Sequence, residues 1–200
     1  MNYFPEYILT AIDYYRPGGI VMVLILVVSL WMWVLIIDRI LFFSNANKRD
    51  LGVKEAVALL KKNSKGLTGS GSCINMMKGF LQERTGDPLL DKKILEQYAI
   101  KEEKALKSSL QLITVLAATA PMMGLLGTVT GMVSTFDVIA LFGTGNARAL
   151  SGGISEALIT TQSGLLAGIP GLFMSRLLKY KSEKMSRRFK IMVMALTRNL

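Results

Sequence analysis

The stretch "PMMGLLGTVTGM", residues 121–132, decides the fold class because it lies within an uncharged run that extends from 108 to 136. A run of about 20 residues is enough to cross ~30 Å of hydrocarbon at ~1.5 Å of helical rise per residue. Two further runs, 18–37 and 157–175, are also free of charged residues. The sequence therefore predicts an all-α integral membrane protein with three transmembrane helices.

The distribution of basic residues predicts the orientation of these spans. The chain has 200 residues, is 51% hydrophobic and nevertheless carries a formal charge of +10. Fourteen Lys and Arg residues lie in 38–107 and eight in 176–200, which leaves only Arg16 and Arg148 elsewhere. The positive-inside rule places both rich segments in the cytoplasm, and the N-terminus and the 137–151 connection outside. Topology and contact with anionic membrane lipid account for the basic excess, so no nucleic-acid partner is expected.

Turn signals divide the rest of the chain into helical segments. The Gly- and Ser-rich stretch 62–73 follows a short helical pattern at 50–62, and RTGDP at 84–88 marks a second break. From Leu89 no glycine or proline occurs before Pro121, so we expect one helix to continue without interruption into the second span. The predicted division is an amphipathic interfacial helix at 1–17, a first transmembrane helix at 18–43, a cytoplasmic helical segment at 44–107, a second transmembrane helix at 108–136, a short periplasmic loop at 137–151, a third transmembrane helix at 152–175 and a basic cytoplasmic helical tail at 176–200.

Small residues recur at steps of three and four in the second and third spans, which places them on one face of each helix. Such faces allow two backbones to approach closely, and close packing drives helix association in lipid. Each span also contains a proline, which frees a backbone carbonyl and favours a kink. Packing alone would explain this pattern. The predicted packing and kink residues are Pro121, Gly124, Gly127, Gly131, Gly164, Gly168 and Pro170.

Three polar residues on or beside these faces are candidates for a functional site. Thr128 and Thr161 either bond back to their own helix or line a narrow polar passage. Glu156 lies near the start of the third span, where a carboxylate at the edge of the hydrocarbon is a functional candidate. The structural alternatives for Glu156 are the helix dipole and a pair with Arg148. With no His, one Cys and no clustered carboxylates, the sequence favours neither an enzyme nor a metal site.

The two motif-bearing spans, "APMMGLLGTVTGMVSTF" at 120–136 and "GGISEALITTQSGLLAGIP" at 152–170, resemble the MotA/TolQ/ExbB proton channel family, and its ExbB branch most closely. The first span ending in "IDRILFF" fits the same family. The resemblance implies a homopentamer whose second and third spans ring a pore around a single-span, ExbD-like partner dimer. Thr128 and Thr161 would then line the proton path, and Glu156 would match the family's acid at the start of the third span.

The resemblance also implies that protons are the coupling ion and that no other cofactor is needed, because the family's proton carrier is an aspartate on the partner helix. The chain itself has no histidine and no ionisable residue in the middle of a span, so it cannot form a proton relay alone. In the ExbB branch, the work of proton flow passes to a TonB-like protein that energises outer-membrane transport. A TolQ-like subunit for envelope maintenance and a non-conducting membrane scaffold are the alternatives.

Overall fold

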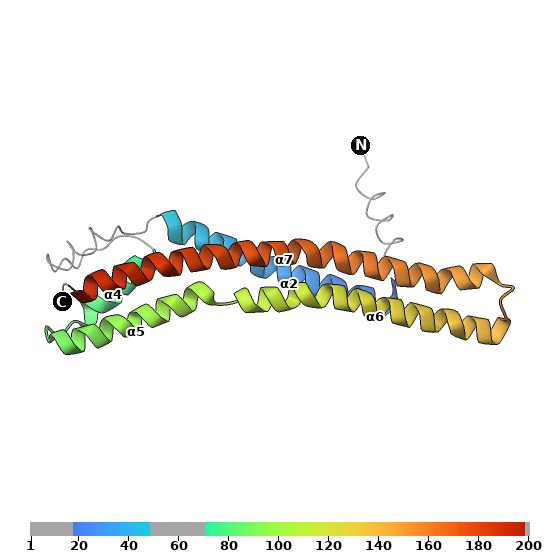
Figure 1. Cartoon of the computed structure of the whole chain (residues 1–200), viewed down its shortest axis with the longest axis horizontal. Coiled ribbons are helices and arrows are strands. Elements are labelled where there is room, and N and C mark those ends of the chain that lie inside the picture. The colour runs from blue at the N-terminus through green and yellow to red at the C-terminus, as the bar shows by residue number, and fades with distance from the viewer. Residues whose placement is uncertain (1–17, 49–70, 199–200) are drawn as a thin grey trace, which may run out of the picture. The chain divides into compact units, whose positions relative to one another are not determined.

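A computed structural model describes residues 18–48 and 71–198, and every described element is helical (Figure 1). The helices predicted over 1–17 and 50–62 lie outside these residues. The all-α prediction is confirmed. The helices of the described residues are α2 (Gly19–Lys48), α4 (Ser72–Glu83), α5 (Pro88–Lys107), α6 (Leu110–Phe142) and α7 (Ala147–Arg198).

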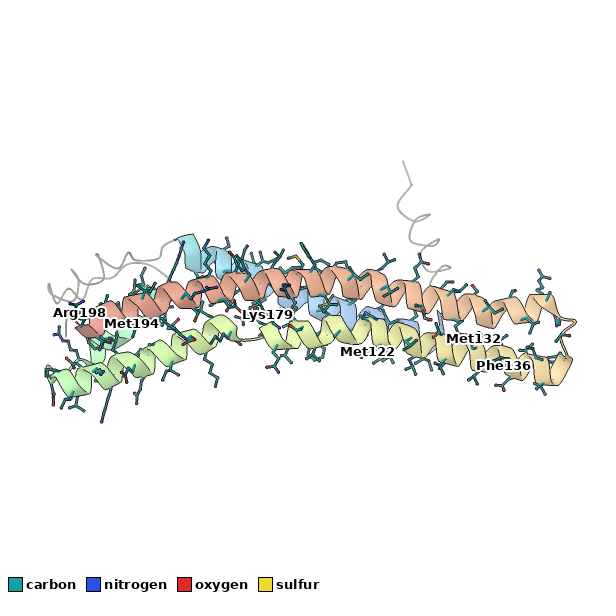
Figure 2. All side chains as sticks on the ribbon, in the orientation of Figure 1. Met122, Met132, Phe136, Lys179, Met194 and Arg198 are labelled. Atoms are coloured by element: carbon teal, nitrogen blue, oxygen red, sulfur yellow. The ribbon has the colours of Figure 1, made fainter. Side chains whose placement is uncertain are left out.

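Three stretches of these helices are long and apolar enough to cross a membrane, namely Gly19–Ala46, Pro88–Phe142 and Leu150–Arg198. The second stretch includes α5, which is rich in Lys and Glu, so its uncharged part lies in α6. Large apolar side chains of α6 are exposed, including Met122 at 69% and Phe136 at 61%, both labelled in Figure 2. Such exposure is expected of a surface that faces lipid. The chain is a multi-pass membrane protein.

The described residues form two compact units. The first, here called the span unit, contains 18–36 and 112–175, and the second, here called the charged unit, contains 37–48, 71–111 and 176–198. In the span unit, α6 and α7 run side by side (Figure 1), and a Cβ added at Gly171 of α7 would collide with the sulfur of Met32 of α2. This contact brings α2 against α7 and buries Met32 completely.

The charged unit has its own apolar core, built from α4, α5 and the C-terminal part of α7. Helix α4 contributes three completely buried side chains, Met76, Met77 and Phe80. They pack with Leu95 of α5 and Leu196 of α7. Burying an apolar side chain of this size is worth ~1.5–3 kcal/mol. These contacts explain why α4, an amphipathic helix of 12 residues, is helical although it is marginal in isolation.

The helix entering the second span is interrupted, and the prediction of a continuous helix was wrong at this point. α5 ends at Lys107, α6 begins at Leu110, and Ser109 has a φ of +61°. Arg39 of α2 donates hydrogen bonds to the carbonyl of Ala105 (3.2 Å) and to the hydroxyl of Ser109 (3.3 Å). Because the last carbonyls of a helix have no intrahelical donor, the guanidinium stabilises the end of α5. No glycine or proline marks this break in the sequence.

The predicted RTGDP turn lies between α4 and α5, as expected, and Asp91 holds it. The carboxylate of Asp91 is buried and accepts hydrogen bonds from the Thr85 backbone (2.8 Å), the Thr85 hydroxyl (3.1 Å) and the Arg84 guanidinium (3.2 Å). Burial by itself raises the pKa of Asp91, but the hydrogen bonds from Thr85 and Arg84 outweigh it and the pKa lies below its usual value. Asp87 caps α5 through the backbone N–H of Leu89 at 2.9 Å.

Asp91→Asn is expected to lower the free energy of unfolding at pH 7 by about 1–3 kcal/mol, because a hydrogen bond to a charged group is worth more than one to a neutral amide. A pKa lowered on folding contributes stability above the unfolded value, near 4, and that stability is lost as the pH falls through the folded value. The wild type should therefore lose more stability between pH 6 and pH 3 than Asp91→Asn does. Thermal unfolding in detergent, followed by circular dichroism, measures both effects.

The matched control is Asp87→Asn, because asparagine caps a helix as well as aspartate does. It should unfold close to the wild-type temperature at pH 7. Equal stability of the Asp91 and Asp87 variants would contradict the role assigned to Asp91.

Candidate functional site

The small faces of α6 and α7 pack against each other, with backbone against backbone. A Cβ added at Gly164 would lie 2.7 Å from the carbonyl oxygen of Ala120 and 3.0 Å from Cα of Gly124. One added at Gly131 would lie 2.7 Å from the carbonyl oxygen of Gly153. These distances leave no room for a side chain, so the glycines allow the two helices to approach closely. We call this contact the α6–α7 seam.

The two prolines are placed differently with respect to the seam. The Pro121 ring lies in it, since a Cβ added at Gly168 would come within 2.5 Å of two of the ring carbons. Pro170 is exposed on α7. Both prolines lie inside their helices, which continue past them. At Gly127 the close neighbour is the side chain of Thr160.

The two candidate threonines donate hydrogen bonds to neighbouring carbonyls of α6. The hydroxyl of Thr161 on α7 donates to the carbonyl of Gly124 on α6 (3.1 Å) and to Ala157 of its own helix (3.1 Å). Thr128 lies four residues after Gly124. A threonine hydroxyl in a helix ordinarily donates to the carbonyl four residues earlier, which for Thr128 is the carbonyl of Gly124. The Thr128 hydroxyl donates instead to Leu125, at 2.6 Å. Both threonines are half-buried, and the α6 carbonyls that they contact belong to adjacent residues.

Buried hydroxyls elsewhere in the seam were not among the predicted site residues. Thr160 is completely buried and donates to the Glu156 carbonyl at 2.8 Å, and Thr135 is buried and donates to Gly131 at 2.9 Å. Their hydroxyls are satisfied within their own helices, which is a structural role. Spacing alone does not separate Thr160 from Thr161, because adjacent residues border the same small face.

A hydrogen bond between side chains joins α6 and α7 at another level. The hydroxyls of Thr114 and Ser175 lie 2.6 Å apart and are partly buried. Ser175 continues the spacing of small residues in the third span, so this spacing indicated that Ser175 would face α6. Thr114 is surrounded in sequence by Ile and Val and gives no comparable signal.

Glu156 lies deeper in its helix than the sequence suggested. α7 begins at Ala147, so Glu156 is more than two turns from the N-terminus, and the helix dipole acts mainly within the first turn. Among the ion pairs of the described residues, none joins Glu156 to Arg148. The half-buried carboxylate instead lies beside the start of α2, because a Cβ added at Gly19 would be 2.7 Å from Oε1. Neither structural alternative for this residue is supported by the described contacts.

Within the described part of the chain, no group of His, Cys, Asp and Glu side chains could hold a metal ion. The seam offers hydroxyls and backbone carbonyls, and the Glu156 carboxylate lies beside the start of α2. Such groups can pass or orient a proton carried by another group. They cannot hold a proton in the middle of the span by themselves.

Comparison with known proteins places this geometry in a family. The family model described as the MotA/TolQ/ExbB proton channel family matches residues 71–191, which include all of α4, α5 and α6 and most of α7. The chain belongs to the MotA/TolQ/ExbB proton channel family. The resemblance deduced from the two spans is therefore confirmed, and the matched region contains every predicted site residue.

Named relatives of this channel family include two branches. The chain is 31% identical over 171 residues to the biopolymer transport protein ExbB-like 3 of Synechocystis, with 81% of each chain covered. It is 29% identical to ExbB-like 1 of the same organism, over 84% of this chain and 70% of the relative. It is also 34% identical to the Tol-Pal system protein TolQ of Pseudomonas aeruginosa, over 44% of this chain and 38% of the relative. These likenesses support a transport role based on a proton channel.

Proposed function

We propose that this chain is the ExbB-like subunit of a motor of the bacterial inner membrane that the proton-motive force drives. In this proposal the N-terminus is periplasmic and the C-terminus cytoplasmic. Five copies of the chain form a ring in which α6 and α7 line a central pore. The pore holds an ExbD-like dimer of single-span chains. Proton flow is passed through that dimer to a TonB-like protein, which energises outer-membrane transport. Family membership and the ExbB-like relatives support this assignment, and the chain itself has no enzymatic step.

The observation that carries the proposal is the hydrogen bond from Thr161 to the Gly124 carbonyl. It places the half-buried hydroxyl of Thr161 against α6, one residue before the Leu125 carbonyl to which the half-buried Thr128 hydroxyl donates. A surface of uncharged hydroxyls and carbonyls suits a proton that arrives on a partner's carboxylate. These groups can hydrogen-bond the partner's carboxyl without binding the proton themselves. The partner must supply the acid, since none of the three uncharged runs contains an ionisable residue.

The proposed mechanism converts charge neutralisation into movement of the partner. A proton enters from the periplasm near Glu156, neutralises the partner's aspartate and is released inward past the threonines. Each change of charge on the partner's aspartate alters which subunit of the ring the partner binds most favourably. The partner dimer and the ring therefore rotate relative to each other. A membrane potential adds ~2.3 kcal/mol per elementary charge per 100 mV, so several protons supply substantial work.

A TolQ-like role in envelope maintenance is the second candidate, and the similarity to the Pseudomonas TolQ favours it. The two roles share the channel and differ in the protein that receives the work. The periplasmic domain of the co-purifying single-span partner distinguishes them.

The first test is proton flux into vesicles that contain this chain with its single-span partner, under an imposed potential. We expect flux only when both proteins are present, because the acid belongs to the partner. Glu156→Gln should reduce this flux at least several-fold, since the carboxylate attracts protons to the entrance. Glu183→Gln, which changes an exposed acid of α7, is the matched control and should conduct like the wild type. A complex that assembles without any flux would support the scaffold alternative.

A further inference from the structure

The charged unit contains a pocket of about 550 Å³ between α2 and α7 that takes no part in the proposed proton path. Its volume lies within the ~300–1,000 Å³ typical of ligand sites. The α2 wall is Ile40, Phe43 and Ser44. The α7 wall is Lys181, Lys184, Met185 and Arg188.

The pocket is strongly cationic. Lys181, Lys184 and Arg188 line it together, and no acidic side chain of the described residues does. Among the described residues, no ion pair involves any of these three cations. The nearby acids are paired elsewhere, Glu183 with Arg187 and Glu103 with Lys107 and Lys190. Three cations around one cavity repel one another, so an anion bound there would be stabilised.

Apart from Ser44, the rest of the described lining is apolar. Phe43 is 4% exposed and packs edge-to-face on Phe42, whereas Ile40 remains 37% exposed. Met185 supplies a flexible apolar surface from the α7 side. A small, fully hydrated anion such as phosphate gains nothing from such a surface. A ligand that combines a phosphate with a hydrocarbon chain matches both halves of the lining.

The position of the pocket along α2 also favours a lipid. Its α2 residues follow the uncharged run 18–37 by three to seven positions, which is ~4–10 Å of helical rise. Headgroups occupy the first several ångströms beyond the ~30 Å hydrocarbon core. Lysine and arginine side chains of α7 are long enough to extend their charges towards that layer.

We propose that this pocket binds the headgroup of an anionic phospholipid. Lys184 and Arg188 hold the phosphate, Ser44 hydrogen-bonds the headgroup, and the start of an acyl chain lies on Ile40 and Phe43. Basic pockets between membrane helices are known to select anionic headgroups. This site is independent of the proton path, because it contains none of the residues assigned there.

The test uses the full-length protein in mixed micelles and compares phosphatidylglycerol with phosphatidylcholine of the same acyl chains. Native mass spectrometry gives the fraction of protein that retains each lipid. The pocket variant is Lys184→Gln/Arg188→Gln. The control variant is Lys179→Gln/Arg187→Gln, which removes the same charge from α7 outside the pocket, and Lys179 is labelled in Figure 2. All four residues are exposed, so the helix should fold in both variants.

We expect wild type and control to bind phosphatidylglycerol at least about fivefold more tightly than phosphatidylcholine, and the pocket variant to lose this preference. Equal affinity of the wild type for the two lipids would overturn the proposal. Equal loss in both variants would also overturn it, because the effect would then reflect net charge alone. A third arm adds inorganic phosphate at millimolar concentration. Displacement of the lipid by phosphate would show a free-anion site, whereas retention supports a lipid site.

Discussion

Thr161→Val is expected to lower partner-dependent proton flux by about tenfold or more in reconstituted vesicles. Valine has the shape of threonine but no donor, so the variant loses the hydrogen bond to Gly124 and the hydroxyl that the passing proton would contact. A hydrogen bond to a charged group is worth ~1.5–3 kcal/mol, and ~1.4 kcal/mol corresponds to a factor of ten in rate. The measurement is flux per assembled complex at a fixed potential.

The adjacent residue supplies the control for this prediction. Thr160→Val makes the same chemical change in a completely buried side chain whose hydroxyl bonds only within α7. It should assemble and conduct close to the wild-type rate. If the two variants conduct equally well, the hydroxyl of Thr161 is only part of helix packing and the proton path must be sought elsewhere.

Gly164→Leu is expected to break the α6–α7 seam. Even its Cβ would lie 2.7 Å from the Ala120 carbonyl oxygen and 3.2 Å from the backbone nitrogen of Gly124, and neither backbone atom can move alone. Overpacking typically costs ~1–3 kcal/mol, and a leucine forced between two backbones should reach or exceed the upper value. Unfolding in a titration with a denaturing detergent measures the loss of stability, and flux should be lost with it.

Gly152→Leu is the matched control on the same helix. No atom lies within 4 Å of a Cβ added at Gly152, and leucine favours helix over glycine by roughly 0.8 kcal/mol. This variant should therefore be as stable as the wild type or slightly more stable. If Gly152→Leu and Gly164→Leu unfold alike, general intolerance of α7 to leucine, rather than the seam, would explain the loss.

The break between α5 and α6 illustrates a feature that local sequence could not predict. No glycine or proline lies at Ser108 and Ser109, and a serine at positive φ is unfavourable by itself. The conformation is stabilised by Arg39, which lies 70 residues earlier in the chain and bonds Ser109 and the end of α5. Sequence periodicity reports the preferences of one segment, whereas this contact depends on which two segments meet.

The sequence alone determined the class of protein, the presence of three spans and the family. Long uncharged runs and glycine spacing are local properties, and the thickness of the hydrocarbon core and the period of the helix relate them directly to spans and packing faces. Only the tertiary structure decided which hydroxyls reach across the seam and which stay within their own helix. It separated Thr161, bonded to Gly124, from its buried neighbour Thr160, and it placed Glu156 beside Gly19 instead of Arg148. The physical reason is that a side chain's partner on another helix depends on rotation and packing of both helices, which the pattern of either one leaves open.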